Sequence, residues 1–93
     1  MEITLNGKSY VTGIVKSRMF RKAIEINEQI DFAQLKSKDL DKLIDFVAEV
    51  YGGQFKRDDV YDGLPADKLM STLSESITGI VSGVAEKFES KNE

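Results

Sequence analysis

The chain has 93 residues, of which 41% are hydrophobic and 31% charged, and it contains no cysteine, histidine or tryptophan. This length corresponds to one small domain spanning residues 1–93, and the composition is too apolar for disorder. The missing residue types exclude disulfides, thiol nucleophiles, Cys/His zinc sites and imidazole general bases. Because no apolar run approaches about 18 residues and an acidic residue stands second, we expect neither a membrane span nor a signal peptide.

The net charge of −3 is unevenly distributed along the chain. Residues 1–22 hold five basic residues and one acidic residue, whereas residues 23–93 hold eight basic and fifteen acidic residues. An acidic body argues against broad nucleic acid binding because it repels phosphate groups. The distribution favours a protein that binds other proteins or a second copy of itself.

The first predicted element is a β-hairpin over residues 1–15. Asn6-Gly7 is a strong signal for a two-residue hairpin turn, since a type I′ turn requires positive φ at both positions. The flanking segments, 2–5 and 8–15, are rich in β-branched and aromatic residues. Two strands alone are marginally stable, so this hairpin is expected to pack on helices or on another chain.

Two helices are predicted next. Ser17 is a candidate N-cap for a helix of about three turns, and residues 27–36 are expected to form a connecting loop. Ser37 is a candidate N-cap for a second helix with an apolar stripe from Leu40 to Tyr51. Gly52-Gly53 should end that helix because glycine tolerates left-handed φ.

Two further helices complete the prediction. A short one should span Arg57–Asp62 and end at Gly63, and Pro65 fits the first turn of a long helix running to about Glu89. A frayed tail is expected at residues 90–93. The predicted fold is therefore α+β and mainly α-helical: an N-terminal β-hairpin, then three to four helices over residues 17–89, the last one long and amphipathic.

The last helix carries an unusual ridge of small residues. Each glycine costs on the order of 1 kcal/mol in a helix interior compared with alanine, so two within one helix need a reason. The ridge allows close approach of another helix, either the second helix of this chain or a partner protein, and a kink at the glycines is a third reading. Its members are Thr72, Ser76, Gly79 and Gly83.

The sequence contains one basic cluster and one acidic cluster. The basic segment 16–22, with Arg18, Arg21 and Lys22, is either a solvated helix face or a protein or nucleic acid contact. The acids Asp58, Asp59 and Asp62 do not have the spacing of a calcium loop, and they suit the start of a helix better.

No catalytic motif occurs in the chain. It has no nucleophile elbow, P-loop or dinucleotide fingerprint, and we therefore predict no catalytic residue, no cofactor and no metal site. A binding protein is the better prediction than an enzyme.

Four segments, taken together and in this order, carry a family resemblance: Met1–Tyr10, Lys16–Lys22, Leu43–Phe55 and Asp58–Leu64, followed by the long amphipathic helix. The chain resembles, over almost its whole length, the short tail assembly chaperones of long-tailed, siphovirus-type phages and prophages of Gram-positive bacteria, in particular the staphylococcal type. The resemblance is specific because of the order of these segments and the total length of the chain, and no single segment is diagnostic.

The resemblance implies a non-catalytic factor acting in the cytoplasm of the bacterial host. Such proteins coat the tape measure protein, keep it soluble, help to recruit tail tube protein subunits and are absent from the mature virion. A longer form of the same protein, made by programmed frameshifting, is an implied partner. An alternative reading is a small phage-encoded nucleic-acid-binding regulator that uses the basic segment 16–22.

Overall fold

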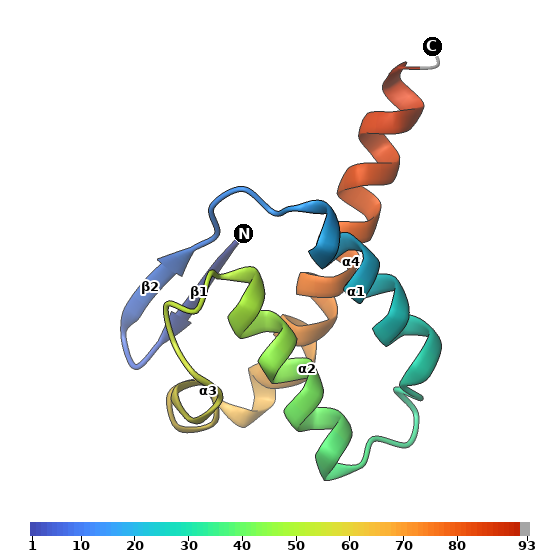
Figure 1. The fold of residues 1–93 in the computed structure, drawn as a ribbon. Helices are drawn as coiled ribbons and strands as arrows, with labels where there is room; N and C mark the ends of the chain where they lie inside the picture. Colours follow the sequence, from blue (N-terminus) through green and yellow to red (C-terminus); the bar gives the residue numbers. More distant parts are fainter. Residues whose placement is uncertain (92–93) are drawn as a thin grey trace.

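The computed structural model describes the backbone of residues 1–91 and the side chains of residues 1–82. The chain forms an antiparallel hairpin and then four helices, so the α+β prediction is confirmed (Figure 1). The elements are β1 (Glu2–Leu5), β2 (Lys8–Val11), α1 (Ser17–Gln29), α2 (Ser37–Val50), α3 (Arg57–Gly63) and α4 (Ala66–Lys91). Within the described residues, no helix is long and apolar enough to cross a membrane.

The hairpin turn forms as predicted, with φ of 51° at Asn6 and 79° at Gly7. Ile3 pairs with Tyr10, so the two side chains share the face of the sheet that packs on the helices. Strand β2 ends at Val11, four residues earlier than expected. Its partner strand β1 spans only Glu2–Leu5, and beyond the paired residues the Thr12 N–H donates to the carbonyl oxygen of Met1 at 3.1 Å.

Both predicted serine N-caps are wrong by one residue. Lys16 and Lys36 occupy the N-cap positions, and Ser17 and Ser37 are the first helical residues. At α2 the carboxylate of Asp39 accepts a hydrogen bond of 3.1 Å from the Lys36 backbone N–H. A carboxylate in the first turn therefore satisfies the backbone where the serine hydroxyl was expected to do so.

Helix α1 also extends farther than predicted, to Gln29, which leaves a connection of residues 30–36 to α2. Ile30 is buried in that connection, whereas Phe32 is partly exposed. Helix α4 likewise passes Glu89 and ends at Lys91, so the expectation of a frayed tail is wrong for residues 90–91, and its remainder, residues 92–93, lies outside the described residues.

The hydrophobic core is built around α2, which contacts α1, α3 and α4. The predicted apolar stripe of α2 is buried, and the core also takes in Phe55, whose ring meets that of Tyr10 edge to face at 5.0 Å between centroids. The core comprises Ile3, Leu5, Ala23, Ile26, Ile30, Leu43, Ile44, Phe46, Val47, Val50, Tyr51, Phe55, Val60, Leu73, Ile77 and Ile80.

The two halves of α4 have different surroundings. The first half packs on α1 and α2 beside the hairpin, and the second half extends away from the other elements (Figure 1). This projection accounts for the elongated shape of the molecule, 44 Å by 30 Å by 22 Å. The fold therefore places the hairpin against the first half of α4, where a groove opens between them.

Candidate protein-interaction site

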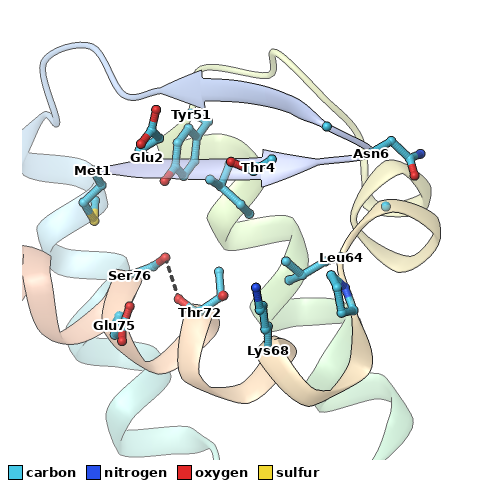
Figure 2. Close-up of a pocket in the computed structure, with 14 residues that line it drawn as sticks. Met1, Glu2, Thr4, Asn6, Tyr51, Leu64, Lys68, Thr72, Glu75 and Ser76 are labelled. Carbon is cyan, nitrogen blue, oxygen red and sulfur yellow. Dashed lines mark hydrogen bonds between the residues drawn. The ribbon is translucent and has the colours of Figure 1, made fainter.

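A groove of about 520 Å³ separates β1 from α4, and we call it the β1–α4 groove (Figure 2). One wall is strand β1, the other is the first half of α4, and Tyr51 at the end of α2 contributes to the lining beside β1. Its lining is mixed: methyl groups, hydroxyls and a few charged groups. The lining residues are Met1, Glu2, Ile3, Thr4, Asn6, Gly7, Tyr51, Gly63, Leu64, Pro65, Lys68, Thr72, Glu75 and Ser76.

The small-residue ridge of α4 faces this groove. Thr72 and Ser76 line it, and the Ser76 hydroxyl donates a hydrogen bond of 2.9 Å to the Thr72 carbonyl oxygen, so this buried hydroxyl is satisfied within its own helix. Gly79 lies at the Met1 end, where an added Cβ would stand 3.4 Å from the Met1 sulfur. Gly83 lies outside the residues whose side-chain surroundings are described. The ridge thus borders the hairpin, with room left between the two elements.

Strand β1 presents an unpaired backbone edge to the groove. The two-residue turn makes Leu5 and Lys8 a hydrogen-bonded pair, and alternation then directs the N–H and C=O groups of Glu2 and Thr4 away from β2. Within the described residues, the one outward group of this edge that has a backbone partner is the Asn6 N–H, which donates to the Gly63 carbonyl oxygen at 3.1 Å. Pro65, predicted in the first turn of α4, stands directly before its first residue Ala66, and the chain leaves the edge before it reaches Thr4.

The basic segment is largely paired within the chain. Arg21 forms an ion pair with Glu25 one turn along α1, and Lys22 reaches across to Glu49 on α2 at 2.7 Å. Arg18 lies elsewhere, at a hollow of about 560 Å³ beneath residues 13–16. Arg18, Arg21 and Lys22 therefore do not line the β1–α4 groove, to which Thr72 and Ser76 contribute.

A polar cluster that the sequence did not reveal joins α2 to α3. The Arg57 guanidinium donates to both carboxylate oxygens of Asp45, at 2.9 and 2.5 Å, and stands 3.5 Å from Asp41. The hydrogen bond from Arg57 holds the pKa of Asp45 below its ordinary value. The Tyr61 hydroxyl donates to Asp41, and this bond, with some desolvation, raises the pKa of Tyr61 to about 12.

This cluster is a structural clamp between two helices. Every charged group in it has an opposite charge or a hydrogen-bond donor beside it, and its side chains are 39–50% exposed. Such a pairing stabilises modestly and offers no unsatisfied group to a substrate. The contact could not be found from spacing alone, because residues 41, 45, 57 and 61 come together only when α3 folds back on α2.

Asp58 and Asp59 lie in the first turn of α3, as expected, whereas Asp62 lies near the end of this seven-residue helix, so the prediction of a helix-start acid is wrong there. The Asp59 side chain takes part in capping the helix. Its carboxylate accepts a hydrogen bond of 2.8 Å from the Lys56 backbone N–H. Across the described residues, no group of three or more acidic side chains is placed to hold a metal ion. The β1–α4 groove and the exposed apolar side chains next to the hairpin are candidate surfaces for binding another protein.

Comparison with known proteins identifies one family. A family model described as phage tail chaperone protein matches residues 1–93, the whole chain. Searches of curated proteins and of solved structures gave no match.

Proposed function

The chain belongs to the phage tail chaperone protein family, and we propose from this premise that it binds the tape measure protein during tail assembly. In this proposal it keeps that long helical protein soluble in the host cytoplasm and helps to recruit tail tube subunits. A longer, frameshifted form of the chain is a further proposed partner. The observation that carries the proposal is the family match over all 93 residues.

The surface of the protein supports a role in reversible protein binding. Large apolar side chains are partly or fully exposed on the hairpin, the following loop, α1, α3 and α4, and they are dispersed over the surface. Dispersed apolar groups give several weak contacts to a long partner, and weak contacts can be released when tube subunits arrive. The exposed side chains are Met1, Val11, Ile14, Ile24, Phe32, Tyr61 and Met70.

Helix α1 is our proposed contact surface for the tape measure protein. Ile24 is partly exposed on this helix, and the Arg21–Glu25 ion pair lies beside it. An apolar side chain bordered by charges is the arrangement that binds one stripe of an amphipathic helix. Arg18, Arg21 and Lys22 would then contact acidic residues of the partner.

The test is co-expression of the tape measure protein with and without this chain. We expect the tape measure protein to be largely insoluble alone and to co-purify with the chain when both are made. The combined reversal Arg18→Glu, Arg21→Glu and Lys22→Glu should reduce co-purification, whereas the combined reversal Lys38→Glu, Lys56→Glu and Lys68→Glu, at exposed positions outside α1, is the control with the same change in net charge. A tape measure protein that stays insoluble with the parent chain would contradict the proposal.

The alternative, a nucleic-acid-binding regulator, has weaker support because the family match is to a tail chaperone. Phosphate, like an acidic protein partner, would have to displace Glu25 from Arg21 and Glu49 from Lys22. If it nevertheless operates, purified chain should retain DNA or RNA at low salt and lose it steeply as salt rises. If the purified chain retains no nucleic acid but binds the tape measure protein, it is the chaperone and not the regulator.

A further inference from the structure

A segment next to the hairpin has strand-like composition but no strand partner. Gly13, Ile14 and Val15 follow β2 directly, and none of their backbone N–H groups donates to a backbone acceptor in the described structure. Ile14 is 91% exposed, more than any other large apolar residue among the described side chains. A hollow of about 560 Å³ lies beside the segment, and Val15 is partly buried against the core, so Gly13 and Ile14 are its exposed part.

The acceptor for such a segment is present on the same molecule. Among the described residues, no backbone group bonds the outward N–H and C=O groups of Glu2 and Thr4 on the open edge of β1, and the β1–α4 groove lies beside them. We propose that residues 13–15 of one copy of the chain add as a strand to the β1 edge of a second copy. This contact goes beyond the proposed function, because it requires no tape measure protein.

The hydrogen-bond pattern selects one register. In an antiparallel arrangement, Gly13 exchanges two backbone bonds with Thr4, and Val15 exchanges two with Glu2. Ile14 then lies opposite Ile3, and residues opposite each other on paired strands point to the same face. Since Ile3 faces the core, Ile14 enters the groove above the small side chains of Thr72 and Ser76. A shift of one residue would leave Ile14 in solvent.

Charge favours the antiparallel direction. Glu2 and Glu75 lie at the Met1 end of the groove, and Lys68 lies at the end nearer Leu64 (Figure 2). In the proposed direction, Lys16 follows Val15 toward the Met1 end and approaches the two carboxylates. In the parallel direction, Lys16 would approach Lys68 instead.

The contact joins two different surfaces, so each copy keeps one of them available after pairing. Residues 13–15 follow β2 and the acceptor is the far edge of β1, on opposite sides of the hairpin. Such a heterologous contact generates an open row or a ring of copies. Each contact is small, so association should depend on concentration and become visible at up to about 1 mM.

Sedimentation velocity over a concentration series of the purified chain tests the contact. The parent should sediment faster as its concentration rises. Ile14→Lys should remain monomeric, because a charge would have to enter the groove, and Thr4→Pro should remain monomeric, because it removes an outward N–H. Val11→Lys, across from Glu2 on the solvent face, and Ser9→Pro, on the outer edge of β2, are matched controls that should behave like the parent.

A mixture of the two disrupted variants gives the sharpest test. Ile14→Lys retains the acceptor edge and Thr4→Pro retains the strand 13–15, so an equimolar mixture should form a dimer and nothing larger. If Thr4→Pro fails to fold by circular dichroism, Glu2→Pro removes the other outward N–H. A parent chain that stays monomeric at about 1 mM, an Ile14→Lys chain that associates like the parent, controls that also lose association, or a mixture without dimer would each overturn the proposal.

Discussion

The Gly63 carbonyl oxygen accepts the Asn6 N–H at 3.1 Å, and this one bond joins the hairpin turn to the end of α3. The approach is close: a Cβ on Gly63 would stand 3.1 Å from the Leu5 Cβ and 3.2 Å from the Asn6 backbone nitrogen. The absence of a side chain at position 63 therefore sets how near α3 comes to β1. It also sets where the chain leaves the β1 edge.

Replacing Gly63 by alanine should destabilise the fold. The added methyl meets backbone atoms that cannot move independently, so we expect a loss of about 1–2 kcal/mol in the free energy of unfolding. Urea denaturation followed by circular dichroism measures it. Gly13→Ala is the matched control, since an added Cβ there meets nothing within 4 Å. Equal stability of the two variants would show that the α3–β1 approach is looser than described.

Removing the carboxylate of Asp45 should weaken the clamp between α2 and α3 at neutral pH. Because the pair with Arg57 is half exposed, we expect Asp45→Asn to cost less than about 1 kcal/mol. The lowered pKa of Asp45 means that this contribution is present above the ordinary value of 3.8 and is lost as the pH falls through the folded-state pKa.

The measurement is urea denaturation of the parent and of Asp45→Asn from pH 7 to pH 2. Their stability difference should shrink toward zero below the ordinary carboxyl pKa. Glu28→Gln on α1 is a control that removes one carboxylate away from the clamp. A difference that does not change with pH would mean that the ion pair contributes nothing.

The Tyr61 phenol should ionise late. Its hydrogen bond to Asp41 raises its pKa to about 12. When the ultraviolet absorbance of phenolate is followed against pH, the parent should show a transition near pH 12 that Tyr61→Phe lacks. Asp41→Asn removes the negative acceptor and should bring the Tyr61 transition back toward 10. The stabilisation from this bond is full below the unfolded value of about 10 and is lost as the pH rises through about 12.

Two substitutions of Gly79 should have different effects, one on the stability of α4 and the other on self-association. Gly79→Ala should raise the melting temperature, since alanine is favoured over glycine by about 1 kcal/mol in a helix and its Cβ makes an ordinary contact with Met1. Gly79→Leu should stay helical, but its longer side chain extends toward the Met1 end of the groove and should weaken self-association. Circular dichroism and sedimentation velocity measure the two effects. Gly79→Leu that associates like the parent would exclude a role for the ridge in self-association.

The sequence predicted the elements well where a local signal dominates. Asn6-Gly7 defined the turn because few residues tolerate two successive positive φ values, and the apolar stripe of α2 defined a core helix because its period matches 3.6 residues. The predictions failed at element ends. Ser17 and Ser37 are residue types typical of N-caps, yet both helices begin one residue earlier, and at α2 the Asp39 carboxylate accepts the Lys36 backbone N–H.

The sequence by itself determined the fold class, the order of the elements and the family resemblance, because turn residues, apolar period and total length are properties of the chain. Only the tertiary structure decided which surfaces are available for binding. It directed the small residues Thr72 and Ser76 toward β1, paired Lys22 with Glu49, and left the β1 edge open while Ile14 stands in solvent. These relationships join residues 27 to about 70 positions apart, and no local pattern encodes which distant segments meet across a packed core.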